Sequence, residues 1–355
     1  MRHAPLDPAD WPALVEVLSA CFGIAPDRWD SFRARLGDAN LRTVRVGGRV
    51  VGGLGVYRMG QVFGGRSVGL GGFAGVGVAA EHRGSGVAAA MMGSALAALR
   101  AGLYASTQRL YRSVGFEQAG SRVGWRVPLR AVGLVERSVG VERVEDPDGV
   151  RPIYRPVHGN LDRSDAIWDR ILRGQGERIL AYRVGDEGYA VLGTEGAGLH
   201  YDVLVRDWQA HTPAAARRLW TLLADHSSLG EHARWQGAAV DAMGAHLPEQ
   251  AATVTGTMRW MIRVLDVPGA LGARGWDHDG ELDLHVEDPL FRENTGAWRV
   301  RVADGRAEVE RGGTGALRCD VRGLAPLYTG FHDAPTLRRL GWIDGDDAAV
   351  RAAAR

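Results

Sequence analysis

The sequence contains no lysine, so all 43 residues of its Lys and Arg total are arginine, and 42 acidic residues leave a formal net charge of +1. A full set of arginines without lysine indicates genomic base composition rather than nucleic-acid binding, and no basic block is interleaved with aromatic residues. We therefore expect no nucleic-acid partner. The absence of lysine also excludes a Walker loop, which needs Gly-Lys followed by Ser or Thr.

Cysteine is almost absent as well, with only Cys21 and Cys319 in the chain. Two thiols so far apart in sequence exclude a disulfide framework and a cysteine-rich zinc site, and they fit a reducing compartment. His226 and His232 are six residues apart, a spacing that would place them on different faces of a helix. We expect no metal.

Long hydrophobic runs are missing too. No stretch approaches the roughly 18 uncharged residues of a membrane span, and the N-terminal sequence MRHAPLDPADW lacks the charged-then-apolar layout of a signal peptide. We predict a cytoplasmic protein without a membrane partner. The chain does have 355 residues with 45% hydrophobic content, more than one core usually serves, so two or three domains are expected.

The first predicted domain, residues 1–130, has the pattern of a mixed α/β fold. Apolar positions from Trp11 to Phe22 recur at helical spacing. Alternating segments flank Gly47 and Gly48, which predicts a hairpin. The expected elements are helices over 8–22 and 27–36, two strands within 41–60, one or two glycine-rich strands within 66–80, and a helix from Val87.

The second predicted domain, residues 131–256, repeats the succession of hairpin, strand and helix. Its last helix should begin with Thr212 as N-cap and Pro213 at the first position. The junction before that helix, VRDWQAHTPAAAR, has no glycine, so we expect it to lack the loop of the first domain. The other expected elements are a helix ending near Leu172, a hairpin around Gly185 to Gly188 and a strand over 199–210.

The third predicted domain, residues 257–355, mixes helices with period-two strands. The expected elements are a strand and short helix within 258–276, strands within 280–289 and 296–312, and a helical end over 334–355. We therefore predict an α+β (mixed α/β) fold in three domains.

One stretch, VGVAAEHRGSGVAAAMMGSAL over residues 76–96, changes from strand to glycine-containing loop to helix. A helix N-terminus behind such a loop is an anion site, because the first-turn N–H groups lack intrahelical partners and the helix dipole favours negative charge. Gly84 and Gly86 let the backbone approach a ligand closely, and Arg83 can add a cation. We expect a phosphate or pyrophosphate there.

Two other glycine motifs compete nearby and fail on context. Residues 69–74 match part of a dinucleotide fingerprint, but a strand follows them rather than a helix. Residues 65–69 match the nucleophile elbow around Ser67, yet no helix stands behind it. We interpret Ser67 as part of a turn between strands.

The frame Val76-x-Val78-x-x-x-x-Arg83-Gly84-x-Gly86-Val87 resembles the coenzyme A loop of the GNAT acyltransferases. Further along, Ser106-x-x-x-x-Tyr111-x-x-x-Gly115-Phe116 is similar to Eis-like acetyltransferases, as is the layout of GNAT domain, degenerate GNAT domain and sterol-carrier-like domain. The resemblance implies a β-bulged central strand and direct acetyl transfer to a primary amine. The implied acetyl-CoA contacts are Val76, Val78, Arg83, Gly84, Ser85, Gly86, Val87 and Ser106.

The same resemblance places Tyr111 at the family's general acid, and a phenol with a pKa near 10 can protonate a thiolate while staying neutral at pH 7. It implies a hexamer and an acceptor of the aminoglycoside type, or another polycation, with a lysine side chain on a peptide as the alternative. Phe22, Asp27 and Trp29 lie on the segment that covers the acceptor channel in this family. A lipid-binding or scaffold protein with a lapsed acyltransferase half is the alternative of another class.

Simpler roles compete for each of these residues. Tyr111, Phe22 and Trp29 could belong to the core, Arg83 could be a solvated charge, and Ser106 could cap a helix. A continuous apolar cavity in residues 257–355 would favour the lipid carrier, and a filled core would exclude it.

Two features depart from the family pattern. A loop helix that runs to about Arg100 leaves almost no connection before the expected strand at residues 102–105, so either the helix ends earlier or a few residues are missing from the sequence. The final sequence AVRAAAR carries no aromatic segment whose carboxylate could serve as base. A shortened chain, a disordered tail or a real loss of that base would each explain the difference, so the sequence does not identify the base; if it is lost, a water or a nearby acid such as Asp27 or Asp30 could replace it.

Overall fold

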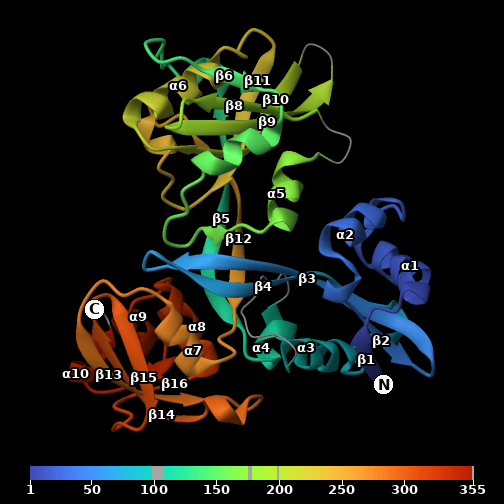
Figure 1. The fold of residues 1–355 in the computed structure, drawn as a ribbon, viewed down its shortest axis with the longest axis vertical. Helices are drawn as coiled ribbons and strands as arrows, with labels where there is room; N and C mark the ends of the chain where they lie inside the picture. Colours follow the sequence, from blue (N-terminus) through green and yellow to red (C-terminus); the bar gives the residue numbers. More distant parts are fainter. Residues whose placement is uncertain (98–107, 175–177, 198–199, 354–355) are drawn as a thin grey trace. The chain divides into compact units, whose positions relative to one another are not determined.

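The computed structural model describes residues 1–97, 108–174, 178–197 and 200–353. The chain forms two compact units (Figure 1). The first unit consists of Met1–Gly120, Pro156–Ile167 and Trp260–Arg355. The second unit consists of Ser121–Arg155 and Trp168–Arg259. None of the helices in these described residues is long and apolar enough to cross a membrane. The three-domain boundaries at 130 and 256 stay a prediction.

The N-terminal part of the first unit is an antiparallel sheet with helices packed on it (blue in Figure 1). Gly47 and Gly48 have φ values of 56° and 81°, the left-handed backbone that a tight hairpin turn requires. The predicted helices and hairpin are confirmed. The strands are β1 (Arg2–Pro5), β2 (Leu41–Val46), β3 (Arg49–Phe63), β4 (Arg66–Val78) and β7 (Leu161–Asp162), and the helices are α1 (Trp11–Phe22), α2 (Arg28–Leu36), α3 (Val87–Ala97) and α4 (Gln108–Ser113).

Helix α1 packs closely on glycines of β3 and β4. A Cβ at Gly53 would lie 2.5 Å from Leu14 Cδ1, and one at Gly77 would lie 2.9 Å from Leu18 Cδ2. Larger side chains at these positions would push the helix off the sheet. The single strand β4 also settles the choice between one and two strands within residues 66–80.

Residues 260–355 form the C-terminal part of the first unit, with a five-stranded sheet in the order β15-β14-β13-β16-β17. Its core is filled by apolar side chains and includes Phe63 and Leu70 from the β3–β4 hairpin. The strands are β13 (Gly280–Glu287), β14 (Gly296–Ala303), β15 (Arg306–Arg311), β16 (Leu317–Asp320) and β17 (Ile343–Asp344), and the helices are α7 (Val267–Ala273), α8 (Val321–Thr329), α9 (Ala334–Arg339) and α10 (Asp347–Ala353).

The second unit is built on a sheet whose strand order is β12-β5-β11-β10-β9-β8-β6. Helix α6 (Pro213–Ala224) starts where predicted: the Thr212 side chain accepts a hydrogen bond from Ala215 N, and Pro213 occupies the first turn. The other elements wholly within this unit are β6 (Glu142–Val144), β8 (Leu180–Val184), β9 (Gly188–Ala197), β10 (His200–Ala210) and β11 (Gly230–Gly237). Three elements are divided between the two units: β5 (Glu117–Pro128), whose residues 117–120 belong to the first unit, α5 (Asp165–Leu172) and β12 (Thr253–Ile262).

Candidate functional site

The glycine loop lies between the end of β4 and helix α3, as the sequence predicts. Gly84 and Gly86 have φ values of 75° and 82°, a backbone that residues with a Cβ adopt only under strain. Among the described residues, no heavy atom lies within 4 Å of the place where a Cβ of either glycine would stand. The first turn of the 11-residue α3 closes with a 3.0 Å bond from Ala90 N to Gly86 O. The loop therefore leaves open space in front of a helix N-terminus, which fits a phosphate-bearing ligand.

Arg83 and Ser85 brace this loop. The exposed Arg83 side chain reaches back so that Nε donates to Val78 O at 3.1 Å and Nη2 lies 3.4 Å from Cys21 Sγ. Ser85 Oγ donates to His82 O at 2.7 Å. Arg83 thus joins the loop to the last residue of β4, and its predicted contact with a phosphate stays a prediction.

Strand β4 carries a bulge just before the loop. Gly53 pairs with Gly77 and Gly55 with Ala74, so Gly75 and Val76 together face Leu54. Gly75 has a φ of 59°, which a bulge of this kind favours. A bulge turns backbone groups out of the ladder, where they can meet a ligand.

The valines of the motif contribute mainly to packing. Val78 and Val87 are buried in the core that also holds Phe73 and Met91, and Val76 is half-buried at its edge. Their backbone groups, rather than their side chains, are what the loop can offer a ligand.

Tyr111 lies on α4 and is only 3% exposed. It belongs to the same core as Val87 and Met91 of α3, and its ring packs edge-on against Phe116 at 5.7 Å between centroids. The Tyr111 carbonyl accepts hydrogen bonds from Val114 N and Phe116 N at 3.1 and 3.0 Å. The predicted acid is therefore buried beside the loop helix. Ser106, the helix end at Arg100 and the expected strand at residues 102–105 lie outside the described residues.

A row of aromatic rings runs from α2 to the bulge. Trp29 packs against Phe22 at 5.8 Å and against Phe32 at 5.4 Å, and Phe32 packs against Tyr57 at 6.3 Å. A Cβ at Gly75 would lie 3.3 Å from Phe32 and 3.4 Å from Trp29. Trp29 is 5% exposed whereas Phe22 is 45% exposed. Trp29 is thus a core residue that supports the bulge, and Phe22 presents a ring to solvent.

Acidic groups accompany these rings. Asp27 is exposed at the start of α2, while Asp30 accepts a 2.9 Å hydrogen bond from Trp11 Nε1. Sequence reasoning missed Phe32 and Tyr57, although Phe32 follows Trp29 by three residues and so shares its helix face.

Sequence reasoning also missed Glu117, a carboxylate with 0% side-chain exposure that is paired with Arg112 and Arg322. Burial is the largest influence and raises the pKa of Glu117, but hydrogen bonds from Arg112, Arg322 and Gln118 N together lower the pKa below its ordinary value of 4.5. The carboxylate is therefore ionised at neutral pH. Its partner Arg322 is 205 positions away in the sequence, which leaves no local signal.

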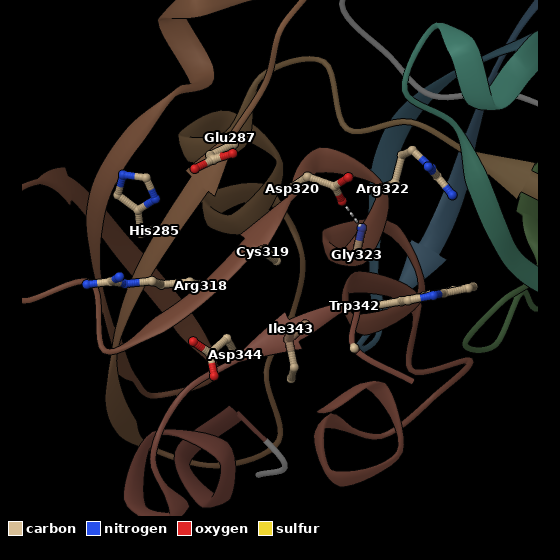
Figure 2. Close-up of a pocket in the computed structure, with 11 residues that line it drawn as sticks. His285, Glu287, Arg318, Cys319, Asp320, Arg322, Gly323, Trp342, Ile343 and Asp344 are labelled. Carbon is tan, nitrogen blue, oxygen red and sulfur yellow. Dashed lines mark hydrogen bonds between the residues drawn. The ribbon is translucent and has the colours of Figure 1, made fainter. Parts of the chain in front are cut away.

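The C-terminal part contains a cavity of about 410 Å³, shown in Figure 2. Charged groups from the ends of neighbouring strands border it, and Asp320 accepts a 2.7 Å bond from Gly323 N within it. The lining residues are His285, Glu287, Arg318, Cys319, Asp320, Arg322, Gly323, Gly341, Trp342, Ile343 and Asp344. This lining and the filled core beside it differ from the apolar cavity expected of a lipid carrier.

Three potential metal ligands meet in the second unit. One ligand atom each from Asp202, Glu231 and His232 lies within 4.8 Å of the others. Polar contacts already engage them, at 3.1 Å between His232 Nδ1 and Asp202 Oδ1 and 3.0 Å between His200 Nδ1 and Glu231 Oε1. The sequence-based expectation of no metal stays a prediction.

The turn expected at Ser67 is wrong by two residues, because Gly64 and Gly65 form the turn between β3 and β4 and Ser67 lies in the strand. It is the second residue of β4, and its hydroxyl donates to Asp162 Oδ2 at 2.7 Å. The partial dinucleotide fingerprint at residues 69–74 lies wholly inside the same strand.

Three family models match the chain. Residues 2–119 and residues 159–264 each match an acetyltransferase (GNAT) domain, and residues 267–355 match a sterol carrier protein domain. The order of these matches confirms the predicted fold class and succession of domains.

Known proteins show the same relationship. A curated relative, an uncharacterized N-acetyltransferase of Streptomyces avermitilis, is 28% identical over 290 residues, which is 68% of this chain and 66% of that protein. Eis1 from Mycobacterium abscessus shares the fold at 22% identity, covering 100% of this chain and 96% of that one with a TM-score of 0.82. A GCN5-related N-acetyltransferase from Anabaena variabilis is 32% identical, covers 99% of this chain and 96% of its own, and has a TM-score of 0.96. The chain therefore belongs to the GCN5-related N-acetyltransferases.

Proposed function

We propose that this protein is an N-acetyltransferase that moves the acetyl group of acetyl-CoA directly onto a primary amine. The open loop at Gly84 and Gly86 carries this proposal, because it combines free space, a helix N-terminus and a neighbouring strand bulge in one place. The backbone N–H groups at the start of α3 suit the pyrophosphate, and backbone groups near Val76 suit the pantetheine amides.

We assign a group of this protein or the solvent to each step of the transfer. The amine nitrogen forms a bond to the acetyl carbon while the carbon–sulfur bond breaks. The electron pair of the broken bond leaves with the sulfur as a thiolate. The Tyr111 hydroxyl gives its proton to that thiolate, and solvent returns a proton to the phenolate. The amine loses a proton to a base, and water, Asp27 and Asp30 are candidates for it. N–H groups of the bulged strand can polarise the thioester carbonyl.

The acceptor we propose is an aminoglycoside or another small polycation. The exposed Asp27 carboxylate and the exposed Phe22 ring stand beside the aromatic row that reaches Gly75. A carboxylate attracts an ammonium group, and an aromatic face attracts a cation that is held over it. A lysine side chain on a peptide, the alternative acceptor, presents the same primary amine.

Thiol release from acetyl-CoA tests the proposal with a panel of aminoglycosides and lysine peptides. We expect acceptor-dependent release, and a fall in kcat of about 100-fold or more in Tyr111→Phe, the scale of a lost general acid. Tyr182→Phe removes a phenol hydroxyl in the second unit and should leave the rate unchanged. Because the chain has no lysine, acetylation of its own lysines cannot contribute to the signal. Release that no acceptor stimulates would overturn the proposal.

We extend the proposal to a homo-oligomer, in the form of a hexamer, and to a cytoplasmic protein whose substrates are small molecules. Light scattering behind size-exclusion chromatography measures the assembly directly. A mass of six times the 38.2 kDa chain is expected, and a monomer at micromolar concentration would contradict it.

A further inference from the structure

Helix α4 carries Tyr111 but has only six residues. Isolated helices shorter than about 12 residues are marginal in water, so contacts outside the helix must fix the position of the Tyr111 ring. The residue that follows, Arg112, leads to such contacts.

Arg112 is held by the buried Glu117 carboxylate at the start of β5. Arg112 Nε lies 3.0 Å from both Glu117 oxygens, and Nη2 lies 2.6 Å from Oε1. Gln118 N also donates to Oε1 at 3.0 Å. A carboxylate that makes two hydrogen bonds to one guanidinium fixes the orientation of that guanidinium as well as its position. Glu117 therefore holds the last turn of α4 against the strand that follows.

The second arginine on Glu117 comes from the C-terminal part. Arg322 Nε and Nη2 donate to Glu117 Oε2 at 3.1 and 2.6 Å. Arg322 stands in the first turn of α8, which Asp320 caps through its bond with Gly323 N. The Arg322 guanidinium is thus anchored to a capped helix packed in the C-terminal core.

Residues 260–355 make a second contact with the end of α4, through Arg263. The fully buried Arg263 pairs with Asp288 at 2.8 Å. A Cβ at Gly115 would lie 2.5 Å from Arg263 Nη1, so this guanidinium lies directly against the backbone that ends the helix. Gly115 has a φ of 89°, the left-handed conformation of a helix C-terminus.

We propose that Arg322 is a positioning residue for acetyl transfer: acting through Glu117 and Arg112, it holds α4 so that the Tyr111 hydroxyl stays where the thiolate leaves. The C-terminal part then contributes to catalysis without touching the substrate. This inference rests on the proposed function, and in particular on Tyr111 as the acid.

The test is a double-mutant cycle in the full chain, with acetyl-CoA and the acceptor that gives the fastest thiol release in the panel. Arg322→Ala should lower kcat about 10-fold while the KM for acetyl-CoA changes less than about 2-fold, because small displacements of a catalytic group cost rate rather than binding. In a Tyr111→Phe background the same change should alter kcat less than about 2-fold, since no proton donor remains to be positioned.

Two variants control for folding. Arg338→Ala breaks a surface pair with Asp347 in the same C-terminal part and should leave kcat unchanged. Arg322→Lys keeps the charge but not the planar two-point contact, so it should recover part of the lost rate. If Arg322→Ala does not fold, Arg322→Lys is measured in both Tyr111 backgrounds, and its smaller fall in kcat should appear only when Tyr111 is present.

The outcomes separate this inference from the proposed function. An equal fall of kcat in both backgrounds, or no fall with Tyr111 present, overturns the positioning role while Tyr111 keeps its own. A normal rate in Tyr111→Phe, or no acceptor-dependent release at all, overturns the proposed acid or activity, and the positioning role with it.

Discussion

Each of the two GNAT-matching regions places a helix after a bulged strand, but of these two helices only α3 has an open N-terminus. In the first unit, Gly84 and Gly86 lead into α3 with space in front of them. In the second, the Thr212 side chain takes the N–H of Ala215 at 3.3 Å, and Pro213 has no N–H to offer. A few residues at one junction therefore decide whether this scaffold presents an anion site.

The strands before these helices differ in a similar way. Both are bulged: β4 at Gly75 and Val76, and β10 at Arg206, between the pairs Val205–Leu192 and Asp207–Val191. Arg206 donates to the carbonyl groups of Ile171 and Arg170, each at 2.9 Å. The second bulge is thus used in internal packing, whereas the first faces aromatic rings beside the proposed acceptor site.

The contrast between the two helix N-termini is tested most directly by changing the glycine loop. Gly84→Ala with Gly86→Ala should raise the Kd for acetyl-CoA about 100-fold, because the free alanine loop relaxes and binding must restore the left-handed backbone at about 1–2 kcal/mol per residue. Gly185→Ala is the matched control, because Gly185 has a φ of 49° in a hairpin turn of the second unit. Isothermal titration measures both variants, and equal affinity in the double variant would contradict the assignment of the loop.

Acid should loosen the first unit more than the second. Glu117 is buried, and its lowered pKa means that the unfolded chain binds more protons between the folded-state pKa and 4.5. Its contribution is complete above pH 4.5 and is lost as pH falls through the folded-state pKa. Glu117→Gln should cost about 1.5–3 kcal/mol at pH 7, and its difference from the unsubstituted chain should shrink below pH 4.5.

Asp225 of the second unit provides the control for that titration. It pairs with Arg137, and the two side chains are 42% and 58% exposed. Exposed ion pairs contribute about 0–1 kcal/mol to stability. Asp225→Asn should therefore change the free energy of unfolding by urea little, both at pH 7 and below pH 4.5. A larger loss for Asp225→Asn than for Glu117→Gln would contradict the comparison.

The smallest effect is expected at the closed helix. Thr212→Ala removes the N-cap of α6 and should lower the free energy of unfolding by about 1 kcal/mol. The affinity for acetyl-CoA should stay the same, because α6 has no role in binding it. Thermal unfolding and titration of the same variant check both parts, and weaker acetyl-CoA binding would place α6 in the site.

Local patterns predicted several elements of both GNAT-matching regions. Helical spacing identified α1 and α2, Gly47 and Gly48 identified the first hairpin, and Thr212 with Pro213 identified the start of α6. Each depends on neighbours in sequence, where capping and turn preferences act. The bulge was expected only through the family resemblance, because register depends on a partner strand.

What the sequence left out depends on long-range contacts. Glu117 reads as an ordinary polar residue until Arg322 is brought to it by the fold. Trp29 and Phe32 read as an amphipathic helix face, and only their contact with Gly75 connects them with the bulge. The cavity of the C-terminal part is lined largely by residues of β13, β16 and β17. These strands are neighbours in the sheet, although β14 and β15 separate β13 from β16 in the sequence.

The most direct test of this account is the stoichiometry of acetyl-CoA binding to the full chain, measured by isothermal titration. The account predicts one molecule per chain, bound at the loop of the first unit and weakened when Gly84 and Gly86 are both changed to alanine. Two molecules per chain, or one whose affinity ignores those glycines, would contradict it.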